Sequence, residues 1–191
     1  MKNILILQNL LKILINLAYK ELLMESLYEI SLKKILSFLD KIGIPYEFTN
    51  IEKECFLPGL FIDKGTLLID KNKLKYVGDV MHEAGHIALM SPEERQTVSG
   101  SLEGILYPEA VEMMTLAWSY AACLEIELDP FVVFHKDGYK GDSENIVSNF
   151  QQGGIIGLPM LQWLGLTNDI IDPSQNKTVA YPKMITWIRQ K

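Results

Sequence analysis

The sequence predicts an α+β fold that is mostly helical and carries one small antiparallel hairpin. Two observations support this prediction. Several long segments repeat apolar residues at three- and four-residue steps, as on the buried face of a helix. Two short apolar segments, residues 59–62 and 66–70, flank a tight turn. Hydrophobic residues make up 48% of the 191 residues, which is enough for a sizeable core.

The first segment of the chain predicts an amphipathic helix. Residues 4–18 are nearly all apolar, and the polar residues in and beside this segment recur every four positions: Gln8, Lys12, Asn16 and Lys20. A membrane-spanning helix needs about 20 residues with few polar breaks, so the segment falls short. We favour a helix that packs on the domain or on a partner. An interfacial membrane anchor and an extension outside the fold are the alternatives.

The chain is therefore divided into an amphipathic helix or extension, residues 1–23, and a single domain, residues 24–191. No internal repeat or low-complexity linker interrupts the second part. Within it, residues 21–42 predict a helix that ends before Gly43 and Pro45. Residues 46–49 predict a short strand that precedes the hairpin.

The rest of the chain predicts further helices. Residues 73–90 form the first, and a capping box of Ser91 and Glu94 with an intervening proline starts the second. Pro108 opens a helix that runs to about residue 128. The remaining predictions are a short helix or strand over residues 131–135 and helices over residues 144–152, 158–164 and 182–190.

Charge and cysteine content limit the classes of function. The net charge is −6, and nucleic-acid binding requires clustered basic residues, so no nucleic-acid partner is expected. Residues 1–76 carry 11 lysines and 9 acids, whereas the remainder carries 7 basic residues and 15 acids. The two cysteines, Cys55 and Cys123, are isolated in the sequence. Two isolated cysteines are typical of a reducing compartment, so we expect a cytoplasmic protein.

The segment His82-Glu83-Ala84-Gly85-His86 indicates a metal site. Two histidines four residues apart lie on one face of a helix, so both can bind one tetrahedral Zn²⁺. Glu83 projects beside the metal, where the general base for a metal-bound water is placed. Because only one other histidine exists, His135, a chance pairing is less probable than in a histidine-rich chain.

A catalytic zinc site needs a third protein ligand. Position 92 is proline and position 89 is leucine, so the pattern with a third histidine six residues after His86 is excluded. We expect an acid from the helix that begins at Pro108, and favour Glu112, with Glu109 as the alternative. Small residues after Glu112 and around Gly85 would let the two helices pack closely. Glu109 would then orient a ligand histidine.

These features resemble the ImmA/IrrE-type zinc metallopeptidases, a compact group of gluzincins with the HExxH motif. The resemblance rests on residues 66–70, 82–86 and 112–117, and covers roughly residues 44–125. It implies a zincin-like domain with the hairpin beside the motif helix, a Zn²⁺ cofactor and a peptide substrate. The residues after the acid depart from the usual family pattern, since Met113, Met114 and Leu116 stand there.

His135 has three interpretations: a donor that stabilises a tetrahedral oxyanion, a further metal ligand, or a histidine without a role in the site. The leading functional hypothesis is a zinc-dependent peptidase in which Glu83 is the general base and His82, His86 and Glu112 bind zinc. The strand of residues 66–70 would be an edge to which a peptide substrate adds. The alternative is a non-catalytic zinc-binding regulatory or interaction module. Membrane association through residues 1–20 is the less favoured hypothesis, and the oligomeric state is left open.

Overall fold

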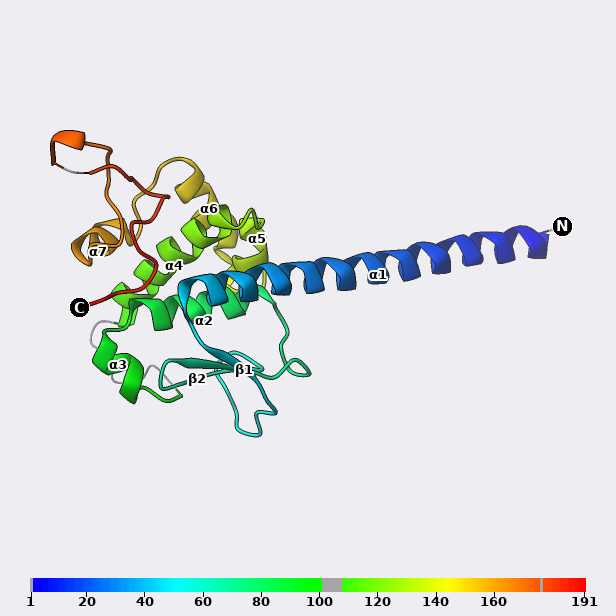
Figure 1. Cartoon of the computed structure of the whole chain (residues 1–191). Helices are drawn as coiled ribbons and strands as arrows, with labels where there is room; N and C mark the ends of the chain where they lie inside the picture. The colour runs from blue at the N-terminus through cyan, green and yellow to red at the C-terminus, as the bar shows by residue number, and fades with distance from the viewer. Residues whose placement is uncertain (1, 101–107, 176) are drawn as a thin grey trace.

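The computed structural model describes residues 2–100, 108–175 and 177–191 and has the predicted α+β fold. A small sheet lies on one side of the central helix α2, Gly78–Leu89, and the helices that follow residue 108 lie on its other side (Figure 1). The core is continuous from the sheet through α2 to α4, Pro108–Glu125. The central helix is therefore buried along nearly its whole length.

One long helix, α1, spans Lys2–Ile42 and crosses the expected boundary at residue 23 without a break. Its last part packs on the body through buried side chains: Ser31, Leu32, Ile35, Phe38 and Leu39. Residues 12–27 are exposed, and Figure 1 shows this part of α1 extending away from the body as a rod. The expected packing of the first segment on its own domain does not occur over residues 12–23.

The sheet has three strands in the order β1-β3-β2. The predicted hairpin is confirmed: β2, Leu60–Asp63, pairs antiparallel with β3, Thr66–Ile69. The predicted strand at residues 46–49 is confirmed as β1, Tyr46–Phe48, but it pairs parallel with β3, so the sheet is mixed. Strand β3 is consequently central and paired on both sides. The expectation that residues 66–70 form a free edge for a peptide is wrong.

The motif helix α2 begins at Gly78, five residues later than predicted. A turn at Asp70 replaces the first part of the expected helix, because the Asp70 carbonyl accepts from the Lys73 and Leu74 amides. The Asp70 carboxylate also accepts from the Asn72 amide. These local bonds compete with helical hydrogen bonding.

The predicted capping box is present at α3, Pro92–Thr97. The Ser91 hydroxyl accepts from the Glu94 amide, and the Glu94 carboxylate accepts from the Ser91 amide at 2.6 Å. After α4, residues 130–133 form the short helix α5, Pro130–Val133, rather than a strand. The turn η1, Tyr139–Gly141, and the helices α6, Ser143–Gln151, and α7, Leu158–Trp163, follow. The turn η2, Pro173–Gln175, precedes the final segment.

The final segment is irregular, so the prediction of a helix over residues 182–190 is wrong. Tertiary contacts fix its path. The Trp187 ring packs edge-on against Phe38 of α1 and Trp118 of α4, and the Trp187 carbonyl accepts from the Trp118 indole. The Arg189 amide donates to the Ala88 carbonyl of α2.

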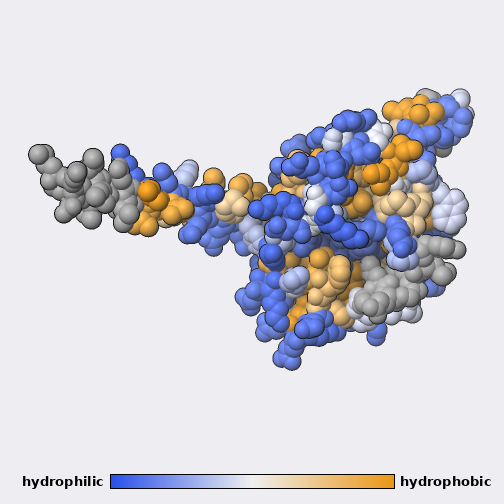
Figure 2. Space-filling view, turned by 180° about the vertical axis from the view of Figure 1, so that it is seen from behind, coloured by the Kyte–Doolittle hydropathy of each residue, from blue (hydrophilic) through white to orange (hydrophobic). Residues whose placement is uncertain are grey.

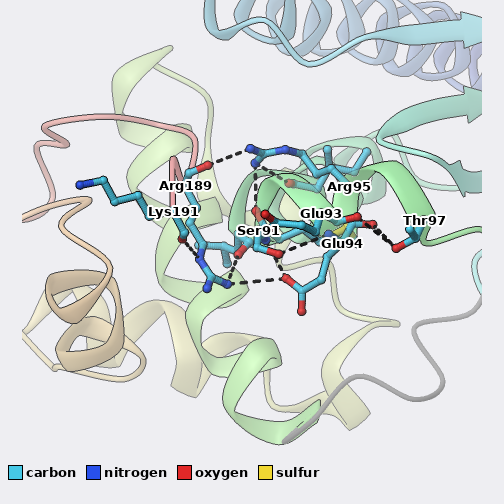
Figure 3. A network of polar contacts seen from close by, with 10 residues as sticks. Ser91, Glu93, Glu94, Arg95, Thr97, Arg189 and Lys191 are labelled. Atoms are coloured by element: carbon cyan, nitrogen blue, oxygen red, sulfur yellow. Dashed lines mark hydrogen bonds and ion pairs between the residues drawn. The ribbon is translucent and has the colours of Figure 1, made fainter.

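A polar network joins this segment to the end of α2 (Figure 3). Arg95 donates to the Met90 carbonyl at 2.9 Å and to the Arg189 carbonyl at 2.8 Å. The Arg189 guanidinium lies 3.6 Å from the Glu94 carboxylate. The network thus satisfies carbonyl groups at and beyond the C-terminal end of α2, which have no partners within the helix.

Within the part of the chain that the structure describes, none of the helices is both long enough and apolar enough to cross a membrane.

Candidate metal centre

The helix α2 brings His82 and His86 to one face, as their four-residue spacing predicts. Both side chains are buried, with relative exposures of 8% and 5%. Their Nε2 atoms lie 3.2 Å apart, so the two rings converge on one point.

The helix α4 supplies the third group and approaches α2 closely at Gly85. A Cβ atom at Gly85 would lie only 3.0 Å from the Thr115 methyl group and 3.1 Å from the Trp118 ring. The expectation that small residues permit close packing is confirmed for Gly85 of α2, but the nearest groups of α4 belong to Thr115, Trp118 and Ser119. The approach brings Glu112, one turn before Thr115, to the two histidines.

His82, His86 and Glu112 form a group whose side-chain atoms lie close enough together to hold one metal ion. One Glu112 oxygen lies 3.4 Å from His82 Nε2, and the other lies 3.4 Å from His86 Nε2. Zinc bonds of about 2.0–2.2 Å at tetrahedral angles separate ligand atoms by about 3.3–3.6 Å. The separations of 3.2, 3.4 and 3.4 Å are close to this range, with each Glu112 oxygen beside a different histidine. Among the described residues this is the group of histidine, cysteine and acidic side chains with metal-binding geometry.

Thr115 fixes the proton position on His86. The Thr115 hydroxyl donates to the Val111 carbonyl at 2.9 Å, so its oxygen is free to accept. That oxygen lies 3.2 Å from His86 Nδ1, which therefore carries the proton of the neutral ring. The lone pair of His86 Nε2 then points towards the group, as a metal ligand requires.

Tyr139 of η1 has the corresponding position behind His82. Its hydroxyl lies 3.3 Å from His82 Nδ1, and the two rings meet edge to face. Burial raises the pKa of Tyr139 well above its usual value, so the phenol stays neutral. Each of the two histidines thus has a polar partner at Nδ1, on the side of the ring away from the point where the Nε2 atoms converge.

The electrostatics of the group favour a cation. Burial opposes the charged form of Glu112, but hydrogen bonds and charge from His82 and His86 outweigh it and hold the Glu112 pKa well below its usual value. Burial lowers the pKa of His82. The hydrogen bond that His82 makes to Glu112 and the charges of the neighbouring acids outweigh burial, so the pKa is raised overall. A carboxylate held in its charged form beside two imidazoles is a set of groups that can bind a metal ion, and the metal would displace a proton from His82.

Glu83 follows His82 on α2, and the charges of His82, His86 and Glu112 affect the pKa of its carboxyl group. Burial raises the pKa of Glu83 above its usual value, and His86 and His82 only partly oppose this rise. A carboxylate with a raised pKa is a stronger base near neutral pH than an exposed one.

The two other residues that the sequence suggested for the site, Glu109 and His135, have no contact with His82, His86 or Glu112 among the polar contacts of the described residues. Glu109 is exposed on the first turn of α4, and the partners of the histidine Nδ1 atoms are Thr115 and Tyr139 instead. His135 Nε2 bonds the buried carboxylate of Asp79 at 3.0 Å, and its ring stacks on Tyr76. The role of His135 as an oxyanion donor stays a prediction.

Thr115 and Tyr139 were not found from the sequence. For Thr115 a signal existed, because it lies three residues after Glu112 and so shares its face of α4. For Tyr139 the sequence offered only its nearness to His135, and its position depends on the fold of η1.

No protein-family model, no curated protein and no solved structure matches the chain.

Proposed function

We propose that the protein is a zinc-dependent peptidase. One observation carries the proposal: the Nε2 atoms of His82 and His86 lie 3.2 Å apart, and each lies 3.4 Å from one oxygen of the Glu112 carboxylate, so the three side chains converge as the ligands of one zinc ion do. Three protein ligands leave a fourth position for water or substrate, which is typical of catalytic rather than structural zinc sites.

In this proposal His82, His86 and Glu112 bind Zn²⁺. Bound zinc lowers the pKa of a coordinated water towards about 7 and polarises a peptide carbonyl. Thr115 and Tyr139 hold the two imidazoles in position. The Glu112 side chain is 44% exposed, which supports access from solvent and favours an enzyme over a closed regulatory module.

Glu83 is the general base. Its carboxylate takes a proton from the attacking water and delivers it to the leaving amine, so it returns to its starting state after each turnover. A site that only binds zinc needs no such carboxylate. Its partly buried position beside the two histidines and its raised pKa both support this role.

The wider assignment combines this site with the sequence. The resemblance to ImmA/IrrE-type gluzincins supports a zincin-like fold and a peptide substrate. Both cysteines are free, with Cys123 buried, which supports a reducing compartment such as the cytoplasm.

The test uses Glu83→Gln, which keeps the size of the side chain and removes its basicity. Purified wild-type protein loaded with zinc should cleave members of a fluorogenic peptide library. The variant should bind zinc equally well and lose about 10²–10⁴-fold in rate, the usual contribution of a general base. Glu109→Gln, an equal change on the exposed first turn of α4, should leave the rate unchanged. Equal cleavage by the Glu83 variant would exclude this mechanism, and absence of zinc-dependent cleavage by the wild type would exclude the function.

A further inference from the structure

The rod formed by residues 12–27 of α1 extends away from the body and has exposed apolar side chains. Every side chain in this stretch is exposed, including Leu14 at 56% and Leu17 at 53%. Figure 2 shows hydrophobic and hydrophilic side chains together on this rod. Apolar surface of this extent on a protruding element marks an interaction site.

The charge of the rod is opposite to that of the rest of the protein. The first 20 residues carry three lysines and no acid, whereas residues 21–191 carry 15 basic and 24 acidic residues. Lys12, Asn16 and Lys20 follow one another at four-residue steps and share one side of the helix. At 3.6 residues per turn, Leu14 lies nearly opposite this side, and Leu17 lies on its flank, within the apolar arc.

These features favour a lipid surface, rather than a second copy of the chain, as the partner that binds the rod. A two-stranded coiled coil buries a narrow stripe of about two residues in seven. Here Ile13, Leu14 and Ile15 are consecutive and all more than half exposed, so the apolar surface is wider than such a stripe. A broad apolar arc with lysines on the polar side is the pattern of helices that lie in the interface of anionic membranes.

We propose that residues 12–20 of α1 dock the protein on the surface of an anionic lipid bilayer. Leu14 and Leu17 enter the boundary of the acyl chains, and Lys12 and Lys20 contact the anionic headgroups. The acids that begin at Glu21 end the lipid-facing segment, and the acidic body stays in the water beyond it. This inference is independent of the proposed peptidase activity.

The test is flotation of the full-length protein with vesicles of phosphatidylcholine alone or mixed with phosphatidylglycerol. The wild type should float with the mixed vesicles and much less with the neutral ones. Binding should weaken in roughly 1 M NaCl, where the Debye length is about 3 Å. Lys12→Gln with Lys20→Gln should weaken binding by about thirty-fold, since each lysine near the surface contributes about 1 kcal/mol.

Two further variants separate docking from a general effect of charge. Lys33→Gln makes the same change at an exposed position of α1 beside the body and should leave binding unchanged. Leu14→Gln with Leu17→Gln should abolish flotation while the lysines remain. Failure of the wild type to float with the mixed vesicles would overturn the proposal. So would equal binding to both kinds of vesicle, or a dimer that forms through α1 without vesicle binding.

Discussion

At the scale of single residues, the Thr115 hydroxyl determines which nitrogen of the neutral His86 ring carries the proton. The hydroxyl proton is committed to the Val111 carbonyl, so the oxygen can only accept from His86 Nδ1. The sequence alone indicated His82, Glu83 and His86, because their spacing on any helix places them together. It did not indicate Thr115, because this contact depends on how closely α4 crosses α2 at Gly85.

Thr115→Val tests this contact. Valine keeps the shape of the side chain and removes the acceptor, so His86 Nδ1 loses its partner and the ring loses its fixed tautomer. We expect zinc affinity to fall by about 10–100-fold, as for other partners of metal-binding histidines. Competition with a chromophoric chelator measures the affinity. Thr97→Val is the control, because that hydroxyl bonds only to carbonyls of its own helix α3. Equal affinity of wild type and Thr115→Val would contradict the assignment.

Glu112→Gln and Glu109→Gln distinguish the two acids at the start of α4. The first removes the carboxylate that lies 3.4 Å from both Nε2 atoms, so we expect zinc affinity to fall by at least about ten-fold. The second changes an exposed side chain and should have no effect. Bound zinc is measured after dialysis against a series of buffered zinc concentrations. A larger loss for the Glu109 variant would assign the third ligand to Glu109.

At the scale of helices and strands, close packing of α2 on α4 assembles the site. Gly85 has the Thr115 methyl group and the Trp118 ring directly above its Cα. The sequence predicted that small residues would face each other here. It did not predict that β1 would pair parallel with β3, because a strand of three residues shows its partner only after the chain has folded.

Substitutions of increasing size at Gly85 test the packing. Alanine must displace Thr115 or Trp118 by a few tenths of an ångström, and leucine by much more. We expect Gly85→Leu to lower the free energy of unfolding by about 1–3 kcal/mol, the usual range for overpacking, and Gly85→Ala to have a smaller effect. Zinc affinity should fall in the same order, because α4 carries Glu112 away from the histidines. Urea unfolding of each variant, with and without zinc, measures both effects. An unaffected Gly85→Leu protein would contradict the close approach.

At the scale of the whole molecule, distant parts of the chain hold the central helix. Trp187 joins α1 to α4 through Phe38 and Trp118, and Arg189 bonds the end of α2. Residues 182–190 were predicted as a helix. Side-chain and backbone partners on three other helices determine their irregular path instead.

The stability of the metal-free protein should depend on pH through the ion pair of His82 and Glu112. The His82 pKa is raised, so its contribution is present below the usual value of about 6.5 and is lost as the pH rises through the raised pKa. The Glu112 pKa is lowered, so its contribution is present above about 4.5 and is lost as the pH falls through the lowered pKa. The pair therefore stabilises the fold most between about pH 4.5 and 6.5.

Melting temperatures of metal-free wild type and Glu112→Gln, measured from pH 4 to 9 (roughly the range of these titrations), check this expectation. The difference between the two proteins should be largest in that window and should shrink towards both ends. In the presence of zinc, the melting temperature of the wild type should rise with pH above this window, because a proton must leave His82 before the metal binds. A difference that does not vary with pH would contradict the ion pair.

The sequence by itself determined the approximate positions of most helices, the hairpin and three of the residues in the candidate site. These features depend on local spacing, capping and turn residues, which act over a few positions along the chain. The tertiary structure alone decided the central place of β3, the partners of the two histidines and the exposure of residues 12–27 of α1. These depend on which surfaces meet, and that is set by packing between segments that are far apart in the sequence.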